Sequence, residues 1–284
     1  MRMGADGLRN TRGEVSADRA SPSAARPMLT ARLLGRFWVV VDGQVVDTSS
    51  SRRTRSVLAY LLAHRGAPVN RDLLMDMFWP GASSEAARNN LHVALSGVRR
   101  VLRAVQPEPL LERWYDMYRL ADWDLWVDVE KFEGHCRDGR RAERAGDVAA
   151  ELRAYELAGQ LYEGDFLADD PYAEWAAGPR EALRLQAIEA QSRLVTLYAA
   201  RGEHGAATLL GRKILTADPC NELVHRQLMI SYVGSRQTHL ALLQYHRCRE
   251  TLWKAFRIRP APETVELYDS LRATAPAFTS ERPG

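Results

Sequence analysis

The chain has 284 residues, 46% of them hydrophobic and 26% charged, and its formal net charge is +3. This length accommodates two domains of ordinary size, each with its own core. No apolar run approaches the roughly 20 residues that span a bilayer, and the polar start of the chain lacks the apolar segment of a secretory signal, so we expect a cytoplasmic protein with no membrane partner.

The first predicted structure is a β-hairpin. Residues 1–28, rich in Gly, Ala, Ser and Arg, are expected to form a disordered tail. The following run, "TARLLGRFWVVVDGQVVDTSS" (30–50), is β-branched and aromatic, with Asp42-Gly43 between two apolar stretches. An Asp-Gly pair in this position is typical of a hairpin turn.

Three helices are predicted after the hairpin. The segments "RRTRSVLAYLLAHRG", "NRDLLMDMFWPG" and "SSEAARNNLHVALSGVRRVLR" have apolar residues at helical spacing. Asn70 is the expected N-cap of the second helix, and Ser83 or Ser84 that of the third.

A second hairpin is predicted in "LLERWYDMYRLAD" (110–122), which is short and aromatic. The order is therefore hairpin, three helices, hairpin. Two helices around a short turn, the second of them longer and basic, followed by a β-wing describe a winged helix-turn-helix.

From residue 123 onward the pattern is helical nearly throughout, and short breaks indicate helix pairs stacked as an α-solenoid. Tyr198 and Ala207 recur 34 residues later as Tyr232 and Ala241, an offset equal to the tetratricopeptide period. The predicted fold is mainly α with small β elements.

The predicted organisation has two domains between two tails. A winged helix-turn-helix covers 29–122, a tetratricopeptide-like helical domain covers 123–273, and 274–284 is a flexible tail. The first domain holds 13 arginines against nine acidic residues, whereas the second holds 20 basic and 23 acidic residues. A basic domain joined to a mildly acidic one fits a nucleic-acid reader with an attached partner module.

The polar side of the third helix is the main candidate functional surface. At about 100° per residue, one face collects the apolar residues, and the only acid of the helix, Glu85, is in its first turn. Surface helices usually interleave both charges, and Arg, Asn and Ser are side chains that bond base edges and phosphates. The candidate DNA-reading residues are Arg88, Asn89, His92, Ser96, Arg99, Arg100 and Arg103. The alternative interpretation is a solvated face, and Asn90, on the other side, is expected to bond within the domain.

Five further arginines are candidates for contacts with the DNA backbone. Arg52, Arg53 and Arg55 are expected to precede the first helix, and Arg113 and Arg119 flank the predicted wing. Charged turn residues and exposed hairpin charges are the alternatives.

An enzymatic function is not expected, because the sequence has no nucleotide-binding glycine loop, nucleophile elbow or HExxH motif. Asp169-Asp170 before Pro171 is interpreted as a helix-ending turn rather than a catalytic dyad.

Metal and cofactor sites are likewise not expected. The cysteines form no CxxC pair and are interpreted as free buried thiols, and the histidines near them are not one helical turn apart. Five tryptophans are interpreted as core or interdomain residues rather than stacking platforms for bases: Trp114, Trp123, Trp126, Trp175 and Trp253.

Two blocks of the sequence resemble known bacterial domains. "LLGRFWVVVDG", "RRTRSVLAYLLAHRGAPVNRDLLMDMFWPG" and "EAARNNLHVALSGVRRVLR" resemble the OmpR-like winged helix. "DVEKFEGHCRDG", "LYEGDFLADDPYAEWAAGPREALRLQAIEA" and the stretch from "HRQLMISYVG" to "ETVELYDSL" resemble the bacterial transcriptional activation domain. Together, over about residues 29–273, they are similar to the small SARP-type activators of antibiotic and other secondary-metabolite gene clusters.

The resemblance implies a regulator that binds direct repeats in promoter DNA as a head-to-tail dimer. The third helix would enter the major groove, the wing would reach the adjacent minor groove, and the activation domain would help hold RNA polymerase, including its sigma factor. Phosphorylation need not control this small form.

One feature departs from the family. Where the wing usually carries a Gly-Gly-Tyr-like turn, this chain has "RWYDMYRL", with Tyr115 and Asp116 in place of glycine. The competing hypothesis is a helical-repeat interaction scaffold whose winged helix does not read DNA.

Overall fold

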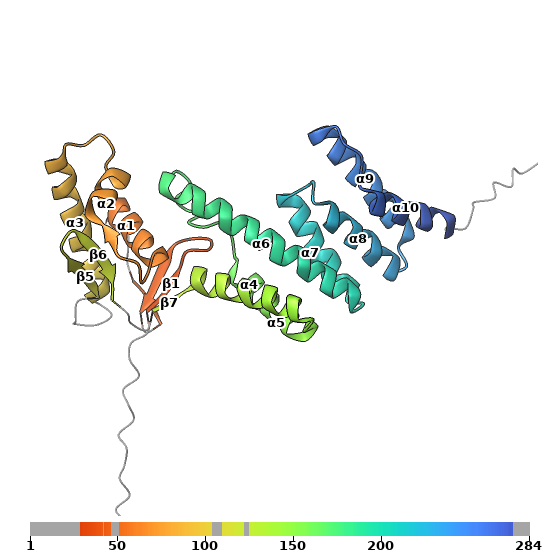
Figure 1. Cartoon of the computed structure of the whole chain (residues 1–284), viewed down its shortest axis with the longest axis horizontal. Helices are drawn as coiled ribbons and strands as arrows, with labels where there is room; N and C mark the ends of the chain where they lie inside the picture. The colour runs from red at the N-terminus through yellow and green to blue at the C-terminus, as the bar shows by residue number, and fades with distance from the viewer. Residues whose placement is uncertain (1–28, 42, 47–50, 104–109, 122–124, 275–284) are drawn as a thin grey trace, which may run out of the picture.

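The computed structural model describes residues 29–41, 43–46, 51–103, 110–121 and 125–274 (Figure 1). The tails predicted at 1–28 and 274–284 lie outside the described residues, except for Thr274 at the end of the last helix. The fold is mainly helical with small sheets, as predicted.

The N-terminal part is mixed α/β. Its elements in chain order are β1 (Leu29–Arg32), β2 (Trp38–Val41), β3 (Gln44–Val45), α1 (Arg52–Ala63), β4 (Val69–Asn70), α2 (Arg71–Phe78), α3 (Ser84–Arg103), β5 (Leu111–Trp114), β6 (Met117–Leu120) and β7 (Leu125–Val127).

The first sheet has the strand order β3-β2-β1-β7. The predicted hairpin is confirmed as β2–β3, which pair antiparallel with Val41 opposite Gln44, and Gly43 in the turn has a φ of +80°. Strand β1 pairs antiparallel with β2 and parallel with β7, and the sequence pattern did not predict either pairing. Because β7 follows residue 122, the N-terminal sheet includes a strand from beyond the expected domain boundary.

The second sheet has the order β4-β6-β5 and contains the predicted wing. Strands β5 and β6 pair from Leu111 opposite Leu120 to Trp114 opposite Met117, so their turn has only two residues. The two-residue strand β4, which was not predicted, joins this hairpin to the start of α2.

The helix starts in this part follow the predicted capping chemistry. The Asn70 side-chain oxygen accepts hydrogen bonds from the backbone N–H groups of Asp72 (2.7 Å) and Leu73 (3.4 Å). Of the two candidates for the third cap, Ser83 is the one whose hydroxyl accepts from the Ala86 N–H, at 3.3 Å. These bonds satisfy N–H groups that have no partner within the helix.

Close contact between α1 and α3 depends on Gly97. A Cβ atom added there would lie 2.6 Å from Cγ2 and 2.8 Å from Oγ1 of Thr54, a buried residue of α1. We expect Gly97→Ala to lower the free energy of unfolding by about 1–3 kcal/mol, because overpacking forces the two helices apart. Urea denaturation would measure this, and Gly97→Ala combined with Thr54→Ala should recover part of the loss. Equal destabilisation in the single and double variants would contradict the steric explanation.

The C-terminal part is all-helical and extends away from the sheets (Figure 1). Its helices are α4 (Asp128–Ala145), α5 (Val148–Leu161), α6 (Glu174–Ala200), α7 (His204–Ala217), α8 (Glu222–Gly234), α9 (Thr238–Phe256) and α10 (Pro262–Thr274). Each packs on its neighbours in the chain, as expected for a solenoid. Of the four residues in the 34-residue repeat, Ala207, Tyr232 and Ala241 are buried and Tyr198 is partly buried against the core.

The two parts are not separate hydrophobic units. One cluster of buried side chains runs from Leu29 of β1 to Leu197 of α6, and a second runs from Val195 of α6 to Leu271 of α10. The first cluster crosses the expected boundary, so the winged-helix part and helices α4–α6 share a core.

Asp128, the first residue of α4, is completely buried at this junction. Its carboxylate accepts hydrogen bonds from the backbone N–H groups of Leu33 (2.8 and 2.9 Å), Leu34 (2.8 Å) and Val129 (2.8 Å). Burial raises the pKa of Asp128, while these donors and nearby Arg32 oppose the rise. The side chain therefore joins the end of β1 to the start of the helical part.

The segment between α5 and α6 docks on the N-terminal part through its backbone. The N–H of Gly35 donates to Asp165 O (3.0 Å), that of Leu167 to Leu33 O (2.8 Å), and that of Ala168 to Gly35 O (2.8 Å). These bonds pair the β1–β2 loop with the segment between α5 and α6, and they therefore connect the two parts of the chain.

An aromatic cluster completes the junction. The indole of Trp175 in α6 lies edge-on to Tyr60 of α1, Phe78 of α2 and Phe166, with ring centroids 5.1–6.2 Å apart. Edge-to-face contacts of this kind add to the free energy of apolar burial. The shared core, Asp128, the docked segment and this cluster hold α1–α3 in a defined orientation to the helical part.

Candidate nucleic-acid interface

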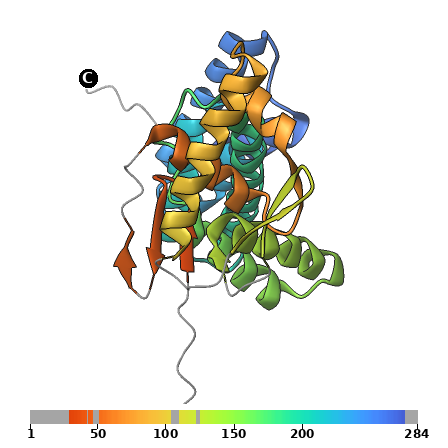
Figure 2. The ribbon, with the colours of Figure 1, turned by 90° about the vertical axis from the view of Figure 1, so that its left-hand side faces the viewer.

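Helix α3 lies at the free end of the molecule, away from the helical part (Figure 1), and faces the viewer in Figure 2. Seven apolar residues of the helix are buried, and they are those of the predicted apolar face: Ala87, Leu91, Ala94, Leu95, Val98, Val101 and Leu102. Six of the seven candidate reading residues are exposed, and Arg99 is half-buried. The helix therefore presents the predicted polar arc away from the core.

The cationic groups of this arc have no ion pair within the part of the chain that the structure describes. Among the described residues, no carboxylate lies within ion-pair distance of Arg88, Arg99, Arg100 or Arg103, although many other arginines of the chain are paired. The Ser96 hydroxyl donates to the carbonyl oxygen of His92, one turn earlier, at 2.8 Å. Four unpaired guanidinium groups on one helix face suit an anionic ligand.

Asn90 corrects one prediction. It is exposed, and the structure gives it no hydrogen bond among the described residues, so the expected bond within the domain is absent. Its angular position, near Gly97 and Val101, suggested that it would face the rest of the domain, but its side chain is exposed.

The three arginines expected to precede the first helix lie in its first turn, since α1 begins at Arg52. Two of them form ion pairs within the chain. Arg52 pairs with Asp170 at 2.6 Å, and this pairing raises the pKa of Arg52. Arg55 pairs with Asp169 and donates to Phe37 O at 3.2 Å. Arg53 is exposed and has no ion pair among the described residues, so it is the one of the three whose charge is uncompensated.

Asp169 and Asp170 have a role that the sequence analysis missed. Asp169 lies in a turn and Asp170 follows it, but this turn does not end a helix as interpreted, because α5 ends at Leu161 and α6 begins at Glu174. Asp169 accepts from the Phe37 N–H (3.1 Å), and Asp170 accepts from the Ser56 hydroxyl (3.2 Å). The two carboxylates bind the helical part to α1 and the β1–β2 loop. Their partners are more than 110 residues away in the chain, and no local pattern indicates such a pairing.

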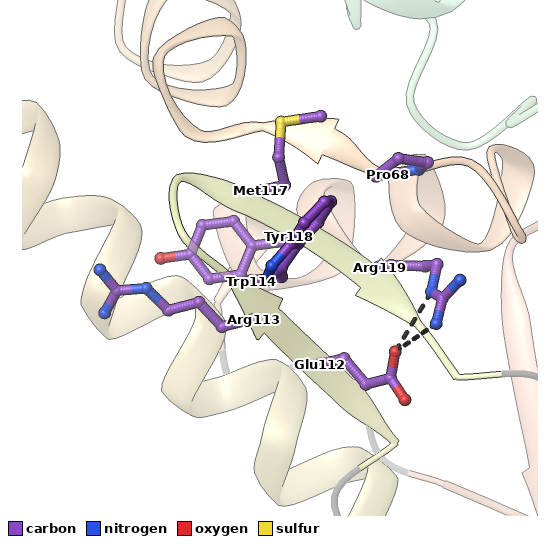
Figure 3. Close-up of a pocket in the computed structure, with 7 residues that line it drawn as sticks. All are labelled: Pro68, Glu112, Arg113, Trp114, Met117, Tyr118 and Arg119. Atoms are coloured by element: carbon purple, nitrogen blue, oxygen red, sulfur yellow. Dashed lines mark hydrogen bonds and ion pairs between the residues drawn. The ribbon is translucent and has the colours of Figure 1, made fainter.

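The arginines of the wing are partly compensated. Arg119 and Glu112 lie opposite each other on β6 and β5 and form an ion pair at 2.7 Å (Figure 3). Arg113 Nε donates to the carbonyl oxygen of Tyr115 at 3.2 Å, and its guanidinium extends toward α3. The neighbouring aromatic residues are exposed, Trp114 by 69% and Tyr115 by 80%.

Two tryptophans differ from the prediction of core or interdomain packing. Trp175 is at the interdomain junction, as predicted, but Trp114 and Trp253 are exposed by 69% and 51%. The guanidinium of Arg257 lies 5.7 Å from the Trp253 ring. Trp126 is half-buried beside Arg32, and Trp123 lies outside the described residues.

One of the histidines of the helical part, His225, has a structural role. His225 is buried and bonds the carbonyl oxygen of Pro219 (3.0 Å) and the side chain of Gln244 (2.7 Å), and burial lowers its pKa. Cys136 and Cys248 are buried free thiols, as predicted, whereas Cys220 is only partly buried.

Within the described parts of the chain, no helix combines the length and the apolar character needed to cross a bilayer.

The helical part matches a known family. The model of the bacterial transcriptional activator domain matches residues 127–272, which is half of the chain. The chain belongs to the bacterial transcriptional activator domain family. The matched region begins at Val127, the last residue of β7, directly before Asp128 at the junction described above.

Related proteins of this family are transcriptional regulators, not enzymes. The chain is 26% identical to the transcriptional regulatory protein MoaR1 of Mycobacterium tuberculosis, over 79% of this chain and 73% of MoaR1. It is 28% identical to the regulatory protein DnrI of Streptomyces peucetius, over 83% of this chain and 89% of DnrI. This family member is accordingly a transcriptional regulator of the SARP type.

The fold is also that of a solved relative. Mycobacterium tuberculosis EmbR, solved in complex with a low-affinity phosphopeptide, superposes with a TM-score of 0.76 and 26% identity. The match covers 87% of this chain and 65% of the EmbR chain, so it includes the N-terminal part as well as the helical part.

Proposed function

We propose that this regulator is a sequence-specific DNA-binding activator of a pathway-specific gene cluster, one for an antibiotic or another secondary metabolite. The observation that carries the proposal is the exposed arc of α3, on which Arg88, Arg99, Arg100 and Arg103 are unpaired among the described residues. A long helix with such an arc, preceded by a short capped helix and flanked by a hairpin, has the shape of a major-groove reader.

The two parts of the chain would have different roles in this function. Residues 29–122 would bind the DNA, with the seven arc residues on base edges and phosphates, and residues 123–273 would recruit RNA polymerase and its sigma factor. The protein would act on the nucleoid in the cytoplasm, as a homodimer on direct repeats.

The shared core supports a rigid link between reading and recruitment. Asp128, Asp169 and Asp170 join the two parts through buried or half-buried hydrogen bonds. A regulator built in this way would place its activation surface at a defined position relative to the promoter, which recruitment of polymerase requires.

Footprinting the full chain on the promoters that adjoin its own gene tests the proposal. We expect two protected segments separated by one helical turn, about 10–10.5 bp between centres, and an affinity that falls steeply as salt rises, because each bound phosphate releases counterions. The absence of protection at every such promoter, with the protein folded, would favour the alternative of a helical-repeat scaffold whose winged helix does not read DNA.

A further inference from the structure

A hollow of about 780 Å³ lies at the junction between the winged-helix part and the helical part. The winged-helix part lines it with residues 35–38, 45–46 and Arg55, and the segment between α5 and α6 lines it with residues 163–164 and 168–169. Small-molecule sites typically have volumes of about 300–1,000 Å³ and occur preferentially at domain interfaces. The size and the position of this hollow are therefore those of a ligand site.

The wall from the winged-helix part is mainly apolar and is held in place. Phe37 is buried, Trp38 is half-buried, and Val45 at the end of β3 is 71% exposed. The guanidinium of Arg55 lies 5.3 Å from the centre of the Phe37 ring, and that of Arg32 lies 5.3 Å from the centre of the Trp38 ring. A cation over the face of an aromatic ring is attracted to it, so these contacts hold both rings where a ligand would meet them.

The two walls meet where backbone approaches backbone. Gly35 has a φ of +99°, a conformation that favours glycine, and a Cβ atom added at Gly164 would lie 3.4 Å from Gly35 Cα. The N–H of Ala168 donates to Gly35 O at 2.8 Å, while the Ala168 side chain is exposed and lines the hollow. The distance between the two walls is therefore fixed by the docking of the two parts.

The lining of the hollow has one positive charge that no carboxylate compensates. Two carboxylates line it, and each has an arginine partner, since Glu163 pairs with Arg32 and Asp169 pairs with Arg55. Arg36 is exposed, lines the hollow and has no ion pair among the described residues. An available guanidinium beside aromatic and aliphatic surface suits a ligand that is apolar over most of its area and anionic at one end.

We propose that this hollow binds a small, mainly apolar molecule that carries one anionic group, such as a carboxylate or a sulfonate. The apolar body of the ligand would lie against Phe37, Trp38 and Val45. Its anionic group would bind the guanidinium of Arg36, because charge-assisted hydrogen bonds are roughly twice as strong as neutral ones. The ligand would contact both walls, so its binding would stabilise the docking of the winged-helix part on the helical part.

Anilinonaphthalene sulfonate is a suitable probe, because it combines aromatic rings with one sulfonate and its fluorescence rises in apolar surroundings. Titration of the full chain with this probe should show one saturable site. Arg36→Ala should weaken binding roughly tenfold or more, since it removes a hydrogen bond between two charged groups. Ala168→Leu should weaken binding as well, because the larger side chain occupies the hollow while the backbone bond to Gly35 is kept.

Two matched controls test non-specific binding of the probe. Arg137→Ala removes an exposed arginine of α4 that has no ion pair in the described chain, and Leu209→Ala removes a leucine of α7 that is 76% exposed. Both should leave the dissociation constant of the probe unchanged. A fixed concentration of the probe should also raise the melting temperature of the wild type and of both controls more than that of Arg36→Ala, because a ligand that binds only the folded chain stabilises it by mass action.

An unchanged dissociation constant in either Arg36→Ala or Ala168→Leu would overturn the inference, and so would the absence of saturable binding to the full chain. Equal weakening in Arg137→Ala and Leu209→Ala would mean that the probe binds charged and apolar surface without a defined site. Circular dichroism would verify the fold of each variant, and Arg36→Lys, which keeps the charge, should retain more affinity than Arg36→Ala. The inference does not depend on the proposed DNA-binding function, so operator binding should persist in Arg36→Ala.

Discussion

The simultaneous substitution of Arg88, Arg99 and Arg100 of α3 by alanine should reduce the affinity for the operator to the affinity for non-specific DNA. Each guanidinium that contacts a base or a phosphate contributes about 1–3 kcal/mol, so the combined loss is on the order of 10²-fold or more. The three side chains are exposed or half-buried and have no ion partner among the described residues, so their removal should leave the fold unchanged. Electrophoretic mobility shift of the operator against a scrambled duplex measures the loss.

A matched control exists on the helical part. Arg137, Arg144 and Arg153 are exposed residues of α4 and α5, without an ion pair in the described chain. Their triple replacement changes the net charge by the same amount but should alter operator affinity less than threefold. Equal losses in the two triple variants would mean that overall charge, rather than the α3 arc, determines binding.

Asp128→Ala should be the most destabilising single substitution at the junction. It leaves the buried backbone N–H groups of Leu33, Leu34 and Val129 without an acceptor, and each buried N–H without a partner costs about 1–3 kcal/mol. We expect the free energy of unfolding to fall by about 3 kcal/mol or more, and the melting temperature by roughly 10 °C. Differential scanning calorimetry and urea denaturation would measure both quantities.

Asp138→Ala on the same helix is the control. Asp138 is an exposed residue paired with Arg141 three positions later, and exposed pairs contribute about 0–1 kcal/mol. Because the core is continuous from β1 to α6, Asp128→Ala should lower the unfolding transition of the winged-helix part and of α4–α6 together. A variant in which only one of these parts melts early would contradict the shared core.

Elements that depend on interactions within a few residues were predicted correctly, whereas contacts between distant segments were not predicted. The turn at Gly43, the cap at Asn70 and the apolar face of α3 follow from interactions within a few residues, and the structure confirms each. The parallel pairing of β1 with β7 and the bonds of Asp169 join segments far apart in the chain. A single sequence carries no periodic signal for these contacts, so they were not predicted.

The candidate interface shows the same division. Except for Asn90, the angular placement of α3 residues correctly separated buried from exposed positions, since a helix has a fixed rotation per residue. Whether an exposed arginine is free to bind a ligand depends on which carboxylates the folded chain places within ion-pair distance of it. Arg52 and Arg55 are paired with Asp170 and Asp169, whereas Arg53 is not, although all three occupy the same short stretch.

By itself, the sequence determined that this protein has a winged helix-turn-helix followed by a helical solenoid, because caps, turns and hydrophobic periodicity are local properties of the chain. The tertiary structure alone decided that the two parts share a core around Asp128 and that the tip of the wing is aromatic and almost neutral. These properties depend on ion pairs and hydrogen bonds between distant segments, which form only when the packing of the whole chain brings the partners within about 3 Å of each other.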